Sequence, residues 1–182
     1  NETADVSSAI RIRMRGNSSR AFDKPSYAIR LVDKEGENNP LSIMGMDAHH
    51  EWVLYGPWLD KTAIRNYMFY NLAGEMMSYA PNVRFCEVIL NGEYEGLYVM
   101  TEVITGGKDG ARLGLRVNAK RSTFSGYLLR LDHQHAGEEA LNSFTTYTYK
   151  TPFMLQIEYP GSRNRDARLT EEIRQDFSNF EK

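Results

Sequence analysis

The sequence predicts an α+β fold in which an antiparallel sheet with one long helix comes first and a second cluster of strands follows. Three observations lead to this prediction. Strand-like segments recur up to residue 102, apolar residues at every fourth position mark a helix over residues 60–77, and strand-like segments return after residue 125. Strands and helices that are segregated along the chain, instead of alternating, are typical of this class.

The most informative segment is a β-hairpin expected over residues 85–102. Asn91-Gly92 lies between two apolar segments, and this pair tolerates the positive φ angles of a type I′ turn. The second arm, residues 94–100, is almost continuously apolar, which predicts a strand in the interior of the sheet, covered on both faces. Glu102 follows at the end of this strand, either solvated or facing a cleft.

Composition sets the outer limits of the interpretation. The 182 residues provide for one domain, or for one lobe and part of another, and 41% hydrophobic with 25% charged residues is usual for a soluble globular protein. The formal net charge of -2 gives no general attraction to nucleic acid. No apolar segment approaches the roughly 20 residues of a membrane span. The lone Cys86 has no partner for an internal disulfide and is expected to be a buried small hydrophobe.

The first strand is predicted over residues 10–15, where Ile or Met alternates with Arg in the pattern of a half-buried strand. Residues 16–20, with a glycine, small polar residues and an arginine, form a turn. Backbone amides and guanidinium groups suit phosphate, so this turn is either an anion site or a solvated hairpin turn. Lys24 precedes Pro25 at the start of the next strand and is either a second phosphate ligand or a surface lysine.

The long helix is predicted over Asp60–Met77. Asp60 is a good N-cap, and an apolar stripe recurs every four residues from Ile64. Arg65 and Asn66 follow on this helix and are either solvated or directed toward a cleft. Just before the helix, residues 52–59 contain both tryptophans and are expected to form core and cleft wall.

A glycine-rich segment at residues 106–110 is the candidate boundary between residues 1–105 and residues 106–182. Beyond it, strands are predicted over Ser125–Asp132, Phe144–Tyr149 and Phe153–Tyr159. Thr170 is the expected N-cap of a final helix whose apolar face comprises Ile173, Phe177 and Phe180. No later segment would cover that face, so we expect that the sequence is truncated.

Five sequence blocks together resemble one protein family. In chain order they read IRIRMRGNSS, KPSYAIRL, EWVLYGPWLDKTAIRNYMFYNLA, VRFCEVILNGEYEGLYVMTE and SGYLLRLD. This order is similar to that of the spore-coat protein H (CotH) kinase-like family, whose members are atypical protein kinases. The resemblance implies that residues 1–105 form a kinase-like N-terminal lobe and that residues 106–182 begin the second lobe.

The resemblance also implies a chemistry. Family members use ATP with a divalent metal, Mg or Mn, to phosphorylate Ser or Thr of spore-coat or secreted proteins. The expected partner is therefore a protein substrate, without nucleic acid or a membrane span, and the expected location is the spore coat or the cell surface. Matching positions to the family's motifs implies a nucleotide site in three segments: the phosphate-covering turn with its following lysine, the helix start, and the link between lobes. These residues are Arg15, Gly16, Asn17, Ser18, Ser19, Lys24, Asp60, Lys61, Arg65, Asn66, Thr101, Glu102 and Val103.

The family's catalytic and metal-binding aspartates follow the SGYLLRLD block, and no matching motif follows Asp132. Asp166 and Asp176, which remain, are not placed as metal ligands would be. We therefore expect a fragment with no catalytic and no metal-binding residue, inactive as a kinase by itself. Two alternatives stay open. The chain could be a structural spore-coat component, or a non-catalytic binding module of the surface-adhesin or carbohydrate-associated type, with an aromatic sugar platform made of Trp52, Tyr55, Trp58 and Tyr67.

Overall fold

The computed structural model describes residues 6–106, 112–118, 120–132, 140–141, 143–150 and 154–182. The chain divides into two units, Asn1–Ile104 and Thr105–Lys182. Among these described residues, the first unit has an antiparallel sheet and one long helix, and the second has two small antiparallel strand pairs and two helices. The predicted α+β class is thereby confirmed.

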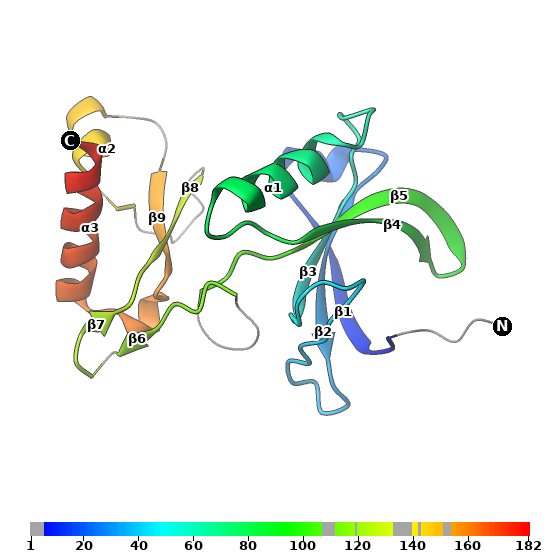
Figure 1. Cartoon of the computed structure of the whole chain (residues 1–182), viewed down its shortest axis with the longest axis horizontal. Helices are drawn as coiled ribbons and strands as arrows, with labels where there is room; N and C mark the ends of the chain where they lie inside the picture. The colour runs from blue at the N-terminus through cyan, green and yellow to red at the C-terminus, as the bar shows by residue number, and fades with distance from the viewer. Residues whose placement is uncertain (1–5, 107–111, 119, 133–139, 142, 151–153) are drawn as a thin grey trace. The chain divides into compact units, whose positions relative to one another are not determined.

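The first unit is built on a five-stranded antiparallel sheet with the order β1-β2-β3-β5-β4 (Figure 1). Asn91 and Gly92, with φ angles of 54° and 91°, form the predicted hairpin turn. The interior position of β5 is also confirmed, although only its second half, residues 98–102, is buried. The strands are β1 (Ala9–Arg15), β2 (Ser26–Val32), β3 (Glu51–Tyr55), β4 (Val83–Leu90) and β5 (Glu93–Glu102).

The prediction that the first strand is half-buried is wrong. β1 is the edge strand of the sheet, paired to β2 alone within this sheet, and all seven of its residues are exposed. Its alternation still has a structural meaning, because Ile12 pairs with Ile29 while Arg13 pairs with Ala28. Residues two apart on a strand share a face, so the three arginines of β1 lie on one face of the sheet.

The hydrophobic core of this unit lies on the opposite face from the arginines. Trp52, at its centre, is completely buried and donates a hydrogen bond from Nε1 to the carbonyl oxygen of His49 at 2.9 Å. The segment between β2 and β3 contributes Met46 to the same cluster, and Cys86 packs at its edge. The predicted core position of Trp52 is thus confirmed. The buried members are Leu31, Met46, Trp52, Leu54, Tyr98 and Met100.

Helix α1 (Arg65–Met76) begins five residues later than the sequence predicts. Residues 60–64 form a turn in which Ala63 has a φ of 57°, a conformation incompatible with a helix. The Asp60 carboxylate accepts a hydrogen bond from the Arg65 amide at 3.0 Å, so it serves the first helical turn without being the N-cap. Tyr67 stacks on Phe85 of β4, with ring centroids 4.5 Å apart, and this places α1 on the arginine-bearing face of the sheet.

The predicted apolar stripe of α1 does not form its packing face. No residue of the helix is buried, and Ile64, Met68 and Leu72 are each nearly half exposed. The helix instead contacts the sheet through Tyr67, which the sequence places at the margin of the stripe.

The second unit pairs β6 (Val117–Asn118) with β7 (Thr123–Phe124) and β8 (Leu128–Asp132) with β9 (Met154–Tyr159). The strands expected over residues 125–132 and 153–159 therefore form, but β8 begins at Leu128, three residues later than predicted. Residue 153 lies outside the described residues. The segment FTTYTY, predicted as a strand, is instead helix α2 (Phe144–Tyr149). Its β-branched and aromatic composition favours a strand, and tertiary context overrides that preference.

Helix α3 (Ala167–Glu181) begins earlier than predicted. Its N-cap is Asp166, whose carboxylate accepts a hydrogen bond from the Leu169 amide at 2.8 Å, and not Thr170. Segments that precede this helix in the sequence cover part of its apolar face. Ile173 is completely buried against the residues of β8 and β9, whereas Phe180 is 83% exposed and lies outside the core.

Candidate functional site

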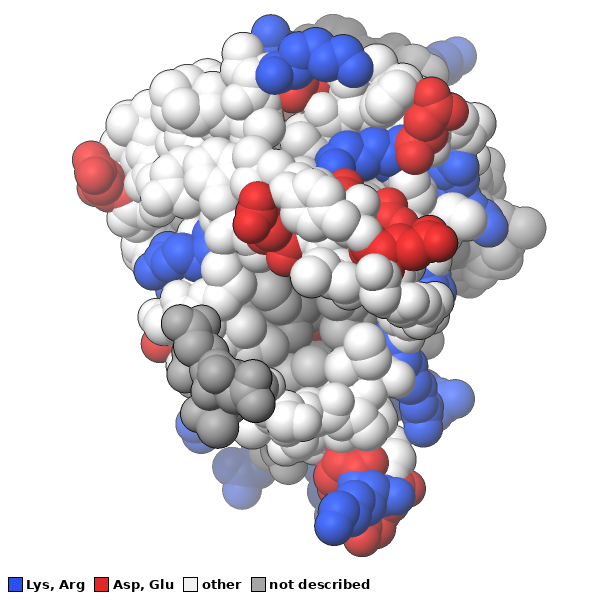
Figure 2. Space-filling model, turned by 90° about the vertical axis from the view of Figure 1, so that its right-hand side faces the viewer, with Lys and Arg blue, Asp and Glu red and all other residues white. Residues whose placement is uncertain are grey.

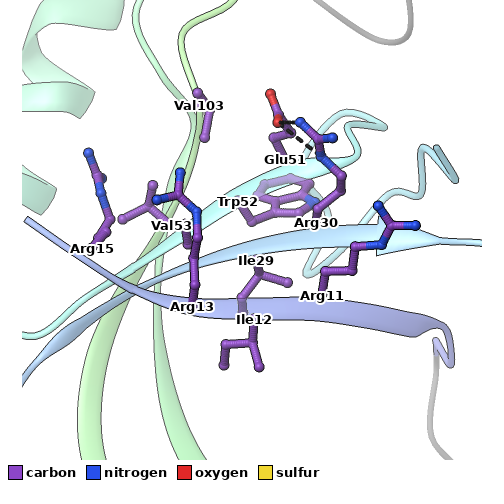
Figure 3. Close-up of a pocket in the computed structure, with 11 residues that line it drawn as sticks. Arg11, Ile12, Arg13, Arg15, Ile29, Arg30, Glu51, Trp52, Val53 and Val103 are labelled. Atoms are coloured by element: carbon purple, nitrogen blue, oxygen red, sulfur yellow. Dashed lines mark hydrogen bonds and ion pairs between the residues drawn. The ribbon is translucent and has the colours of Figure 1, made fainter. Parts of the chain in front are cut away.

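A cavity of about 400 Å³ lies on the arginine-bearing face of the first unit, over β1, β2 and β3 (Figure 3). Two cross-strand rungs define it. In one, Arg13 pairs with Ala28 and Ala28 pairs with Val53; in the other, Arg11 pairs with Arg30 and Arg30 pairs with Glu51. Ala28, Val53 and Val103 give the cavity an apolar surface, and arginines give it positive charge.

The arginines that line the first cavity differ in their hydrogen bonds and ion pairs. Arg11 donates from Nη2 to the carbonyl oxygen of Gly36 at 3.2 Å, and Arg30 forms an ion pair with Glu51. Arg13 and Arg15 have neither an ion pair nor a side-chain hydrogen bond to any described residue. Two guanidinium groups therefore stand beside an apolar surface with their donors available.

A second cavity of about 320 Å³ adjoins the turn after β1. Arg15 lines both cavities, and Gly16 and Ser19 of the turn line the second, together with Tyr55 and Trp58. Arg11 and Arg15 are four residues apart on β1, which corresponds to about 13 Å of extended strand. The two cavities therefore share Arg15. The cavity on the strands is lined by most of the charged residues, and the cavity at the turn has the larger apolar share.

The turn itself requires glycine at position 16. Gly16 has a φ of 108°, and a Cβ built there would lie 2.0 Å from Ser19 Oγ. The following residues form a short 3₁₀ helix, Ser18–Ala21. Asn17 and Ser18 are exposed and do not line the cavity, so Gly16 and Ser19 are the members of the predicted turn that the structure brings to Arg15.

Lys24 lies away from both cavities. Its Nζ donates to the carbonyl oxygen of Glu95 at 2.6 Å and stands 4.3 Å from the centre of the Tyr98 ring, on the core face of the sheet. Burial raises the pKa of Tyr98 to about 12, so the ring beside the ammonium group is the neutral phenol. The lysine contacts β5 where Gly96, with a φ of 81°, accompanies the bulge in the β4–β5 pairing.

The family resemblance implies four nucleotide-site residues at the start of the helix, and none of them lines the second cavity. Lys61 Nζ stands 4.1 Å from the ring centre of Trp58, a lining residue, and so reaches the rim. Asp60 is engaged by Thr62, whose hydroxyl bond is the main cause of its lowered pKa, and by Arg65 at 3.6 Å. Neither Arg65 nor Asn66 lines either of these two cavities.

Of the linker residues, Val103 alone lines the first cavity. The Glu102 side chain is neither solvated nor in the cavity, because it is 3% exposed and accepts a hydrogen bond from the Tyr79 hydroxyl at 2.9 Å. Thr101 is buried beside it and donates from Oγ1 to the Glu102 carbonyl at 3.3 Å. Thr101 and Glu102 therefore stabilise the end of β5 and do not face the cavity.

Four charged residues of the first cavity are absent from the sequence-based assignment: Arg11, Arg13, Arg30 and Glu51. A signal for the first two was present in the sequence, because they share the strand period of Arg15. Arg30 and Glu51 become neighbours only through the β2–β3 register, which sequence reasoning did not supply.

A buried histidine lies next to this end of β3. His49 is 2% exposed, its Nδ1 accepts a hydrogen bond from the Glu51 amide at 2.9 Å, and it stacks on His50. Burial, and secondarily the charge of His50, lower the pKa of His49 below its ordinary 6.5. The folded state therefore binds this proton less tightly than the unfolded state does.

Stability is consequently expected to fall on acidification. The His49 contribution is fully present above about pH 6.5 and is lost as the pH falls from there toward the lowered pKa of the folded state. Urea unfolding followed by circular dichroism between pH 7.5 and 5 should show this decrease. His49→Asn, whose amide oxygen can replace Nδ1 as acceptor, should show a smaller one. An unchanged slope in the variant would assign the pH dependence to other groups.

Charge elsewhere offers no extended patch on the face in Figure 2, where lysine and arginine lie interspersed with acidic and uncharged residues. Among the described residues, no group of three or more His, Cys, Asp or Glu side chains is arranged to hold a metal ion. Within the same part of the chain, no helix has the length and apolar composition to cross a bilayer.

The aromatic set considered as a sugar platform does not form one surface. Trp52 is completely buried in the core, and Tyr67 is stacked on Phe85. Only Tyr55 and Trp58 line a cavity together, beside Arg15 and the glycine turn.

Comparison with known proteins bears on these observations as follows. A search of curated proteins found no match to the chain. The family model described as CotH kinase protein matches residues 12–176, which is most of the chain and includes the strands, the glycine turn and both cavities except Arg11. The chain therefore belongs to the CotH kinase family.

Proposed function

We propose that the first unit is the nucleotide-binding N-terminal lobe of a CotH-type atypical protein kinase, which transfers phosphate from ATP to Ser or Thr of a spore-coat or secreted protein. The second unit then begins the C-terminal lobe. The single observation that carries the proposal is the pair of cavities that share Arg15. One offers an apolar surface for a base, and the other offers a glycine turn and a guanidinium group for phosphates.

The positive charge of the site supports the proposal that it binds nucleotide phosphates. Phosphoryl transfer depends mainly on positioning and on positive charge around the phosphates, with little covalent help from protein. Arg13 and Arg15 supply charge that is not neutralised by any described carboxylate. Lys24 would join them only if it left the Glu95 carbonyl, so the arginines are the phosphate ligands of the proposal.

The second part of the proposal is that the chain binds nucleotide but transfers no phosphate by itself. Mg²⁺ or Mn²⁺ requires carboxylate ligands, and the described residues do not form a cluster that fits a metal ion. This chain's own residues then bind and orient the nucleotide, and the metal would be held by residues outside those described here. The protein substrate and the location at a spore coat or cell surface follow from family membership alone.

Isothermal titration of the chain with Mg-ATP tests the proposal. Wild type is expected to bind Mg-ATP, and Gly16→Val is expected to lose most of this affinity. A valine disfavours the backbone φ of 108° at position 16, and its side chain would collide with Ser19. Gly161→Ala is the control, since a Cβ there meets nothing within 4 Å. Equal binding by wild type and Gly16→Val would contradict the assignment of the turn.

A further inference from the structure

The outer end of the first cavity is formed by an ion pair whose geometry leaves one acceptor unused. Arg30 donates to Glu51 Oε1 from Nε at 3.1 Å, and its Nη2 donates to the same oxygen. Glu51 Oε2 has no hydrogen-bond partner among the described residues. Figure 3 shows the pair at the opposite end of the cavity from Arg15.

Two backbone amides near this pair are already engaged within the unit. The Val103 amide donates to the Glu51 carbonyl oxygen at 3.2 Å, and the Glu102 amide donates to the Asn82 carbonyl oxygen at 3.3 Å. A base in the cavity cannot accept hydrogen bonds from these two linker amides without breaking bonds within the unit. The Glu51 side chain supplies an acceptor at this end of the cavity.

We propose that Glu51 selects adenine over 6-oxopurines by accepting a hydrogen bond from the exocyclic amino group of the base. This inference rests on the proposed function, which puts a nucleotide in the two cavities that share Arg15. A carboxylate only accepts hydrogen bonds, so it attracts an amino group and repels a carbonyl oxygen at the same position. Arg30 is the positioning residue, because both of its bonds restrain Glu51 on the neighbouring strand.

The spacing of the cavity is consistent with this orientation. The Arg11–Arg30–Glu51 rung lies about 13 Å along the strands from the level of Arg15, where the glycine turn begins. A base over Ala28 and Val53, with its amino group toward Glu51, directs its ribose and phosphates toward Arg15 and Gly16. Glu51, at the far end from the phosphates, avoids their repulsion.

The test compares ATP with ITP, whose hypoxanthine base has a carbonyl oxygen in place of the amino group. Titrations of wild type are expected to show at least about tenfold tighter binding of ATP, since a hydrogen bond to a charged group is lost with ITP. In Glu51→Gln the amide can turn and donate to that oxygen, so the two affinities should become equal within about twofold. Glu35→Gln removes the same charge from an exposed loop and should keep the wild-type preference.

Two outcomes separate this inference from the proposed function. If wild type and Glu51→Gln bind ATP with the same preference over ITP, Glu51 does not read the base, while the nucleotide site itself stands. If wild type binds neither nucleotide, both proposals are wrong. Circular dichroism verifies folding of each variant, and Glu51→Ala, which also lacks the acceptor and should lose the ATP preference, replaces Glu51→Gln if that variant does not fold.

Discussion

Arg15→Ala is expected to weaken Mg-ATP binding by at least about tenfold, the largest effect of any single arginine of the site. Arg15 lines both cavities, and no described residue neutralises it. A hydrogen bond between charged groups contributes about 1.5–3 kcal/mol when it is made to a ligand. Because each 1.4 kcal/mol is about tenfold in affinity, the loss should be visible in a direct titration.

Arg163→Ala is the matched control for this variant, because it removes the same charge from an exposed position in the second unit. It should bind Mg-ATP as wild type does. The same comparison at several salt concentrations separates a specific contact from general attraction, since screening affects exposed charges alike. Comparable losses in both variants would indicate nonspecific attraction and would count against the site.

Trp52→Ala is expected to destabilise the first unit by about 3–5 kcal/mol, a typical cost of truncating a completely buried aromatic residue. The substitution leaves a cavity at the centre of the core and leaves the His49 carbonyl oxygen without the indole donor. Urea unfolding monitored by far-ultraviolet circular dichroism measures this change without relying on tryptophan fluorescence.

Met76→Ala provides the comparison within the same unit. Met76 is 78% exposed at the end of α1, so its replacement should change the free energy of unfolding by less than about 0.5 kcal/mol. If Trp52→Ala is no more destabilising than Met76→Ala, the indole does not occupy the core position described here.

The sheet and its hairpin could be predicted from sequence because their signals are local. Asn91-Gly92 specifies a turn, and the apolar arm of β5 specifies an interior strand. The exposure of β1 could not be predicted from the sequence. The alternation of apolar residues with arginine shows that the two faces of the strand differ, but it does not show whether another layer covers one of them. β1 is exposed since it pairs only to β2 within this sheet and lies at the edge.

The helices show where local patterns mislead. Asp60 has the composition of an N-cap, yet its carboxylate acts across a turn containing Ala63 in a left-handed conformation. The four-residue apolar period of α1 predicts a buried stripe, whereas the contact with the sheet is made by Tyr67. In the second unit, residues 144–149 form a helix despite a composition that favours a strand.

The site could be predicted only in part for a related reason. Arg15, Gly16, Ser19 and Val103 line the cavities, and the first three are consecutive or nearly so in the sequence. Glu51 and Arg30 depend on strand register, and the position of Lys24 over Tyr98 depends on a bulge in a distant strand pair. Such long-range geometry leaves no local pattern in the sequence.

A crystal structure of the chain with a nonhydrolysable ATP analogue tests the central claim most directly. The account predicts the base over Ala28 and Val53, and the phosphates at Arg15 and the Gly16 turn. An analogue bound elsewhere on the chain, with Arg13 and Arg15 still free of ligand, would contradict the account.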